Sequence, residues 1–352
     1  AARPPRRTRT KGGTVVSERS RPVSDLGVQE PANAKPCPLC GEARSSLLYE
    51  ARDYRTSRGE TAYPLLRCDG CHLIRIAPWI PLSREDGYTE QLDVRRLSQV
   101  RPGAGRSTTS ARMRQKERVR QAVWERCAMV GACGGGKILD IGCGAGDFLA
   151  ALDRGRWTPV GVERSHPLAT LAQEATGVPI LPAEPWRLPF PGAAFDVATA
   201  WGSFEHFDNQ MAVLREVRRV LRPGGRAFFL IPNVRGVLFG LLRVADPPRH
   251  RFHFTAETFL LALEKAGFDP AAARIRYVRP CTGNGLLHAF KAFSRRFSIR
   301  AKVRREAGDP PGAAVSMFLH RLVKLIGFAL HPLSGVLAAV GISDLMIVDA
   351  VR

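Results

Sequence analysis

The sequence has few acidic residues, few lysines and no long apolar run. A membrane-spanning helix needs about 18 or more consecutive apolar residues, and no such stretch without a charge exists. Residues 1–30 also lack the apolar segment of a signal peptide. We therefore expect a cytoplasmic protein, and the basic segments described below leave contact with the inner face of the membrane open.

The charge balance is strongly basic. The 352 residues include 53 Lys plus Arg and 32 Asp plus Glu, which gives a formal net charge of +21. Such an excess favours contact with nucleic acid, an anionic membrane or a phosphorylated acceptor. Only 8 of the 53 basic residues are Lys, however, so a compositional preference for Arg explains the charge equally well. An apolar content of 45% is that of a globular chain and excludes a wholly disordered one.

Four of the eight cysteines form two C-x-x-C pairs, Cys37 with Cys40 and Cys68 with Cys71, separated by 27 residues. Two tight turns that each offer two thiolates are typical of a zinc ribbon. Four thiolates complete a tetrahedral shell, so we expect a structural Zn²⁺ with no open position. His72 directly follows the second pair and offers a competing ligand, but four cysteines suffice.

From Lys137 onward, short apolar runs alternate with amphipathic segments, which predicts a parallel sheet covered by helices. The expected class is an α/β fold with a doubly wound, seven-stranded Rossmann-like sheet. Its strands are expected at residues 137–141, 159–163, 178–181, 195–201, 226–231, 274–278 and 345–351. Helices are expected at residues 147–154, 167–176, 209–221 and 256–266.

The first of these strands runs into a glycine-rich loop. Gly142, Gly144 and Gly146 follow a G-x-G-x-G spacing, and Asp140 lies two residues before the first glycine. Glycines let the backbone approach a ligand closely at the carboxyl end of a strand, where open α/β sheets bind ligands. Asp140 would repel a phosphate and attract an ammonium or sulfonium group. Glu163 ends the next strand, where a carboxylate can accept hydrogen bonds from ribose hydroxyls.

These features resemble the class I S-adenosylmethionine-dependent methyltransferases. The resemblance covers about residues 119–268 and includes, in the family's order, the segments 183–184 with 188–191, 195–197, 205–206, 221–225, 231–233 and 266–268. It implies that S-adenosylmethionine is the methyl donor. The residues that it places on this cofactor are Asp140, Gly142, Cys143, Gly144 and Gly146 at the methionine end, Glu163 at the ribose, Ala183 and Glu184 at the adenine, and Trp201 and Gly202 as the floor of the pocket.

The cysteine-bearing segment is similar to the N-terminal zinc-binding module that precedes many methyltransferases of polysaccharide, sugar and secondary-metabolite gene clusters. The expected organisation is a disordered basic tail (1–34), a zinc ribbon (35–81), a basic linker with a lid helix (82–120), an S-adenosylmethionine-binding core (121–278), an insertion (279–343) and the final strand of the core (344–352). Within the insertion, residues 315–330 have the pattern of an amphipathic helix and follow a basic run at 291–305. Three roles stay open for this helix: capping the site, forming a homodimer or binding a membrane surface.

Two segments offer catalytic residues. Glu205–His206 follows the fourth strand, where the resemblance places it over the reactive end of the cofactor. We predict His206 as the general base for the acceptor's proton, with Glu205 as its orienter or as a substrate ligand. His250 follows the fifth strand at the position of a substrate-proximal histidine of the family, and we predict that it contacts the acceptor; His253 lies between two phenylalanines, which favours packing. Ubiquinone-pathway O-methyltransferases carry a related Glu-x-x-Glu-His arrangement that can bind a divalent metal, but Gly202 replaces the first Glu here, so no catalytic metal is predicted.

The leading hypothesis is methyl transfer to a hydroxyl of a small molecule, glycan or lipid-linked acceptor, with a sugar carbon as the next choice. The first alternative is an RNA (rRNA base) methyltransferase, because some of those enzymes join a zinc module to this fold and a basic surface would bind phosphates. Against it, the chain lacks the Asn-Pro-Pro-Tyr type of motif, and its basic stretches lack interleaved aromatic residues for base stacking. The second alternative is a membrane-surface-associated protein.

Overall fold

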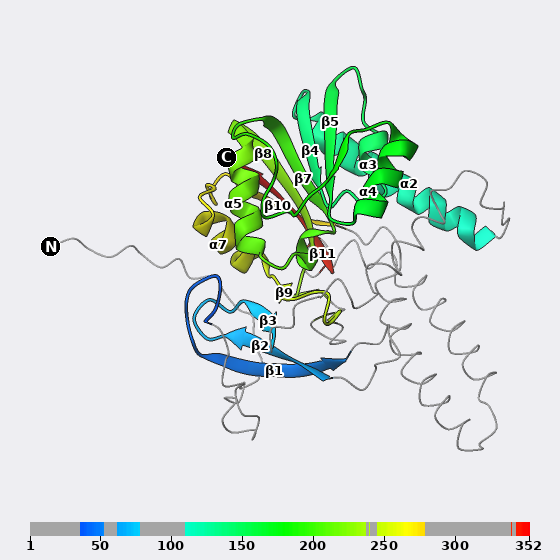
Figure 1. Cartoon of the computed structure of the whole chain (residues 1–352). Helices are drawn as coiled ribbons and strands as arrows, with labels where there is room; N and C mark the ends of the chain where they lie inside the picture. Colours follow the sequence, from blue (N-terminus) through cyan, green and yellow to red (C-terminus); the bar gives the residue numbers. More distant parts are fainter. Residues whose placement is uncertain are drawn as a thin grey trace, which may run out of the picture.

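A computed structural model of the chain describes residues 36–52, 62–77, 110–236, 239, 245–278, 339 and 343–352. The predicted tail, most of the basic linker, and the insertion helix at 315–330 with the basic run before it lie outside the described residues. The described part contains two sheets and five α-helices (Figure 1).

The main sheet has seven strands in the order β10-β11-β8-β7-β4-β5-β6. Its parallel strands are β4 (Gly136–Ile141), β5 (Trp157–Glu163), β6 (Ile180–Pro182), β7 (Phe195–Trp201) and β8 (Leu221–Pro232). At the other side of β8, β11 (Leu345–Val351) runs antiparallel to both β8 and β10 (Arg274–Val278). The predicted seven-stranded Rossmann-like sheet is confirmed, and β8 begins earlier than expected.

Helices cover both faces of this sheet. On one face lie α2 (Ser110–Gly131), α3 (Asp147–Ala150) and α4 (His166–Thr176), and on the other lie α5 (Gln210–Val220) and α7 (Ala256–Lys265) (Figure 1). The α5 helix buries Val213, Leu214, Val217 and Val220, which recur at helical spacing and form one apolar stripe. The α4 and α7 helices likewise bury apolar residues at helical spacing against the sheet, as an α/β fold requires.

Local side-chain hydrogen bonds set the helix ends. Ser165 begins α4 by accepting from the N–H of Leu168 (3.4 Å), and Thr255 begins α7 by accepting from the N–H of Thr258 (3.2 Å). The α3 helix ends at Ala150, earlier than the predicted end at residue 154. Asp153 accepts instead from the N–H of Gly155 (2.9 Å), a turn that competes with continued helix.

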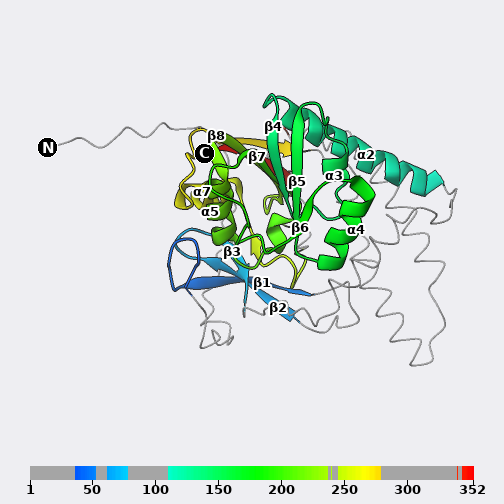
Figure 2. The ribbon, with the colours of Figure 1, turned by 45° about the horizontal axis from the view of Figure 1, so that its top comes forward.

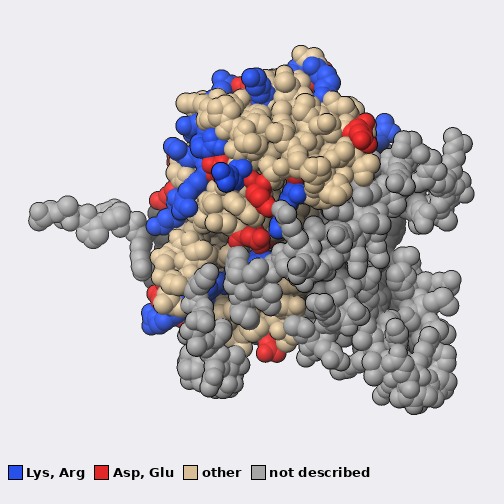
Figure 3. Space-filling model, viewed as in Figure 1, with Lys and Arg blue, Asp and Glu red and all other residues tan. Residues whose placement is uncertain are grey.

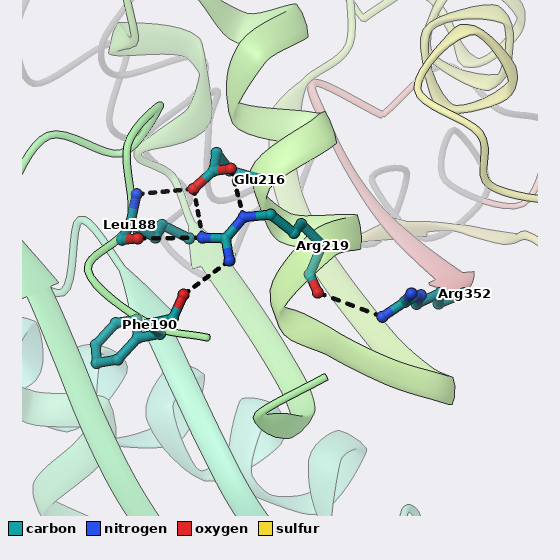
Figure 4. Close-up of polar contacts among 5 residues, drawn as sticks. All are labelled: Leu188, Phe190, Glu216, Arg219 and Arg352. Atoms are coloured by element: carbon teal, nitrogen blue, oxygen red, sulfur yellow. Dashed lines mark hydrogen bonds and ion pairs between the residues drawn. The ribbon is translucent and has the colours of Figure 1, made fainter. Parts of the chain in front are cut away.

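Arg219 of α5 joins the helix to a neighbouring loop and to the chain end (Figure 4). Its guanidinium group pairs with Glu216 (2.7 Å) and donates to the backbone carbonyls of Phe190 (2.7 Å) and Leu188 (3.1 Å). Arg352 donates in turn to the carbonyl of Arg219 (3.3 Å). These contacts hold the loop before β7 against α5, the helix that follows β7 in the chain.

The second sheet has four antiparallel strands in the order β1-β2-β3-β9. Strands β1 (Ser45–Arg52), β2 (Ala62–Cys68) and β3 (Ile74–Ile76) belong to the cysteine-bearing segment. We call its described residues, 36–52 and 62–77, the cysteine module. The fourth strand, β9 (Phe252–His253), comes from the segment between β8 and α7. Figures 1 and 2 both show the small sheet beside one end of the main sheet, with β9 between them.

Candidate functional site

The glycine loop lies where the winding of the main sheet changes direction. β4 pairs with both β5 and β7, so the loop at its carboxyl end opens into the crevice between the two halves of the sheet. Gly142, Gly144 and Gly146 have φ angles of 71°, 56° and 78°, which L side chains rarely adopt. A Cβ on Gly142 would lie 2.6 Å from the Cβ of Ser203, so this loop depends on glycine for its close approach to the segment after β7.

Asp140 is buried at the carboxyl end of β4. The hydroxyl of Thr199 on β7 donates to its Oδ1 at 2.7 Å. Burial raises the pKa of Asp140 to about 7 in spite of that hydrogen bond. A nearby cation would favour the ionised form of this carboxyl group. The predicted methionine-end acid thus lies where a positively charged group would be stabilised.

Cys143 lies inside the same loop with its sulfur against β5. A Cβ on Gly161 would lie 2.7 Å from the Cys143 Sγ, so Gly161 makes room for the thiol. Burial raises the pKa of the Cys143 thiol, which therefore stays protonated at neutral pH. Its role in the structure is packing within the loop.

Glu163, the predicted ribose ligand, ends β5 and contacts the glycine loop. Its Oε2 accepts from the N–H of Gly144 at 3.0 Å, and its Oε1 accepts from the N–H of Ser165 at 3.1 Å. The side chain is half-buried. The structure therefore brings the two predicted cofactor acids, from adjacent strands, to the same end of the sheet.

A chain of ion pairs, which the sequence did not predict, runs from the adenine side to the segment after β8. Glu184, which together with Ala183 follows β6, pairs with Arg164 (3.5 Å), and Arg164 pairs with Asp208 (3.7 Å). Asp208 also pairs with Arg251, a nearly fully buried side chain, at 3.0 Å. We call these four charged residues the Glu184–Arg251 ion chain. Arg164 directly follows Glu163, the predicted ribose ligand, and this position was the feature of the sequence that could have indicated a role for Arg164 near the site.

Trp201 ends β7 and Gly202 follows it, and the ring of Trp201 packs on the α2 and α3 side of the sheet. The Trp201 ring lies 5.5 Å from the ring of Phe148 and 6.2 Å from that of Phe228, and Arg126 of α2 lies 5.4 Å from its centre. Gly202 has a φ of 70°, and its N–H donates to a carbonyl of β8 at 3.0 Å. Cofactor contact by these two residues stays a prediction, and packing is what the Trp201 contacts show.

Glu205, His206 and His250 come together from two segments. Glu205 and His206 lie in the short 3-10 helix η3 (Phe204–His206), and the candidate ligand atoms of all three residues lie within 4.8 Å of one another. The two imidazole rings are 4.8 Å apart, and His250 Nε2 lies 3.9 Å from Asp246. Burial raises the pKa of Glu205 to about 7. We call Glu205, His206 and His250 the acid–histidine cluster.

This cluster adjoins the glycine loop. Ser203, directly before η3, donates its hydroxyl to the carbonyl of Ile141 at 2.7 Å. Gln210 donates to the carbonyl of Phe204 at 2.8 Å and so holds η3 against α5. The three predicted catalytic residues therefore lie beside the loop predicted to bind the cofactor. The sequence did not predict that His250 would meet the other two.

His253 lies nearby but is buried. Its ring is 4.9 Å from that of Phe239, and burial lowers its pKa to about 4. A neutral, buried imidazole among aromatic rings fits the packing role expected for it.

The four thiols of the two C-x-x-C pairs converge within the cysteine module. Their sulfur atoms all lie within 4.8 Å of one another, with Cys37 and Cys71 at 3.6 Å and Cys40 and Cys68 at 3.5 Å. Tetrahedral coordination with Zn–S bonds of about 2.3 Å places sulfur atoms about 3.8 Å apart, so the arrangement fits a zinc ion. Burial opposes ionisation of Cys40, but the N–H of Glu42 and the neighbouring thiols lower its pKa to about 7.

His72 is outside this thiol cluster and exposed. Its φ of 65° puts it in the left-handed region, and its N–H donates to the carbonyl of Cys68 at 3.0 Å. Its backbone therefore closes the turn of the second C-x-x-C pair. Glycine would adopt this conformation with less strain.

On the described part of the face shown in Figure 3, basic residues are interspersed with acidic ones. Among the described residues, no helix has the length and apolar character needed to cross a membrane.

Comparison with known proteins assigns a domain to the α/β region. Residues 111–273 match the sequence model of a family described as "Methyltransferase domain". A 27-O-demethylrifamycin SV methyltransferase of Amycolatopsis mediterranei is 32% identical over 161 residues, which are 42% of this chain and 59% of that protein. A ubiquinone biosynthesis O-methyltransferase of Bordetella avium is 28% identical over 171 residues, which are 44% of this chain and 70% of that protein. The chain thus spans well under two thirds of the length of the first of these relatives.

Among solved structures, an S-adenosylmethionine-dependent methyltransferase from Archaeoglobus fulgidus matches with a TM-score of 0.44 and 17% identity. The match covers 68% of this chain and 94% of that one. The strand order found here defines the fold on its own.

Proposed function

We propose, on the premise that residues 111–273 form a methyltransferase domain, that the chain is an S-adenosylmethionine-dependent methyltransferase acting on a hydroxyl oxygen of a small molecule. The observation that carries this proposal is the acid–histidine cluster beside the glycine loop. The names of both relatives above refer to methylation at an oxygen atom, which supports oxygen as the acceptor atom.

The residues at the carboxyl ends of β4 and β5 fit the cofactor. Asp140 is a buried acid whose ionised form a nearby cation would favour, and S-adenosylmethionine carries an ammonium and a sulfonium group. Gly142, Gly144 and Gly146 have positive φ angles and no side chains, so a ligand can approach the backbone of this loop closely. Asp140 and the loop would hold the methionine end, and Glu163 would hold the ribose. When bound, the cofactor supplies an electrophilic methyl carbon whose bond to sulfur breaks as the acceptor oxygen attacks.

The acid–histidine cluster would handle the acceptor. His206 is exposed and would take the hydroxyl proton as the new O–C bond forms, while buried Glu205 orients it. His250, from the segment after β8, would contact the acceptor beside His206. Alignment of the acceptor behind the methyl carbon is the larger part of such catalysis, because the reaction is a single displacement.

We also propose that Cys37, Cys40, Cys68 and Cys71 hold a structural zinc ion. Four thiolates fill the tetrahedral shell, so this ion would stabilise the cysteine module without binding a substrate. Metal analysis of the purified chain should give about one zinc per chain, and Cys71→Ser should remove it.

Transfer of a tritiated methyl group into fractionated cell extract tests the proposed activity. We expect label in a small-molecule fraction, as a methyl ether of a hydroxyl group. His206→Gln should lower the rate about 10²- to 10⁴-fold, the usual contribution of a general base, and should leave S-adenosylmethionine affinity unchanged.

Glu205→Gln should also lower the rate, whereas the matched control Glu264→Gln, at an exposed acid of α7, should not. Label in bulk RNA but not in small molecules would refute the choice of acceptor. A second bound metal that disappears in His250→Ala would instead show that the cluster is a metal site, and the general-base assignment would be wrong.

A further inference from the structure

The cysteine module is joined to the segment that carries His250 by backbone pairing. β3 runs antiparallel to β9, with Ile74 opposite His253 and Arg75 opposite Phe252. The N–H of Ile76 donates to the carbonyl of Arg251 at 3.0 Å. His250 therefore precedes, by a single residue, a backbone carbonyl held by the cysteine module.

β9 depends on this pairing for its regular structure. It has two residues, and β3 is its only strand partner in the part of the chain that the structure describes. The next contact along the segment is a single parallel bridge between Asn233 and Phe254. A two-residue strand without a partner has too few hydrogen bonds to persist, so β3 is what makes β9 a strand.

Side-chain packing joins the same two parts. Cys37, Leu39, Cys68 and Leu73 of the cysteine module share the main core with two phenylalanines of the segment, Phe252 and Phe254. In a second cluster, Ile74 and Ile76 pack with Val234 and Ala245, which both belong to the segment between β8 and β9. The segment of residues 245–254 is thus held by apolar contacts from the cysteine module in two clusters.

We propose that the cysteine module positions His250 in the acid–histidine cluster, and does so through the β3–β9 pairing. The assignment of His250 to the acceptor side rests on the proposed function, but the pairing and its effect on the segment do not. Cys68 and Cys71 flank the turn between β2 and β3, so a metal bound by the four thiols would also fix β3. The module then acts on the acceptor half of the site and leaves the glycine loop unaffected.

Two proline substitutions at adjacent positions separate this role from general damage to the module. Ile76→Pro removes the N–H that donates to Arg251, whereas Ala77→Pro removes an N–H that donates to Pro64 inside the module (3.0 Å). Ile76→Val keeps the N–H and tests rescue by a conservative change. All three variants are made in the full, metal-loaded chain, and metal content is measured for each.

Hydrogen exchange and histidine NMR are the measurements. In Ile76→Pro, backbone amides of residues 249–254 should exchange about tenfold faster or more, and the ring resonances of His250 should move. Neither change should occur in Ala77→Pro or Ile76→Val. Removal of the metal by a chelator should reproduce the effect of Ile76→Pro, and this arm decides the question if that variant does not fold.

Calorimetry with S-adenosylmethionine separates this proposal from the proposed function. Affinity for the cofactor should change less than about threefold in all variants, because the glycine loop makes no contact with β3 in the pairings described. Unchanged exchange and unchanged His250 resonances in both Ile76→Pro and the chelated chain would overturn the positioning role. Absence of cofactor binding in the unmodified chain would overturn the proposed function and leave the exchange result intact.

Discussion

S-adenosylmethionine should bind this chain more weakly as the pH falls below 7, because a proton on Asp140 competes with the cationic ligand. Burial raises the pKa of Asp140 from about 4 for a free side chain to about 7 in the folded chain. A positively charged ligand beside the carboxylate favours its ionised form. Below pH 7 a growing fraction of the chain must lose this proton before it binds.

The size of the effect follows from the titration. At pH 5, two units below a pKa of about 7, about one chain in 100 carries an ionised Asp140. If the bound cofactor keeps the carboxylate ionised throughout, the dissociation constant at pH 5 should be about 80-fold higher than at pH 7.5, which corresponds to about 2.6 kcal/mol.

Calorimetric titration between pH 5 and 7.5 measures this dependence. Asp140→Asn lacks the titrating carboxyl group. The pH dependence of its binding therefore reports every other group that titrates, including the amine of the cofactor, and serves as the baseline. Thr199→Val removes the hydrogen bond that lowers the pKa of Asp140 and should move the midpoint to higher pH. If the unmodified chain and Asp140→Asn gave parallel profiles, Asp140 would not be the group that meets the cation.

Three further outcomes concern stability and metal binding. His72→Gly should keep the metal and should not lower the free energy of unfolding, because His72 occupies a left-handed conformation; metal analysis and thermal unfolding check this. In a denaturant titration, Arg219→Ala should lower the free energy of unfolding by about 1–2 kcal/mol, because two backbone carbonyls lose their hydrogen-bond donor. The control Arg222→Ala removes a more exposed ion pair with Asp196 and should lower it by less than about 1 kcal/mol. Burial lowers the pKa of His253 to about 4, so its contribution to stability is complete above about pH 6.5 and is lost as the pH falls toward 4; the loss, about 3 kcal/mol, should be absent in His253→Phe.

The main sheet could be predicted because its strands are apolar runs of ordinary length bounded by glycine, proline and polar residues. The same holds for the glycine loop, where spacing and the acid at Asp140 carry the signal. Strands of two or three residues, such as β3 and β9, carry no period, so their pairing was not predictable. The early end of α3 was not predicted, because the turns that follow Ala150, one of them capped by Asp153, carry no apolar period.

The candidate site divides in the same way. Residues tied to a local motif, such as Glu163 and the four cysteines, were found from spacing, and the structure brings each set together. The meeting of His250 with Glu205 and His206 depends on the path of the chain after β8, which no local pattern encodes. Trp201 was assigned by resemblance, and its aromatic neighbours were invisible in the sequence because they come from α3 and β8.

Arg251 connects the parts of the site that the sequence treats separately. Arg251 is buried, with 3% of the residue exposed, and its guanidinium group pairs with Asp208. Asp208 pairs in turn with Arg164, which lies next to the predicted ribose ligand in the chain. The backbone carbonyl of Arg251 accepts from Ile76 of the cysteine module. Removing either partner of the Arg251–Asp208 pair would leave the other charge uncompensated, and because the Asp208 side chain is 23% exposed, the cost should lie below the value of about 3–5 kcal/mol typical of a fully buried pair. Because His250 precedes Arg251 directly in the chain, the ion chain and the β3–β9 pairing together would fix His250, the proposed acceptor residue, relative to the predicted cofactor acids Asp140 and Glu163.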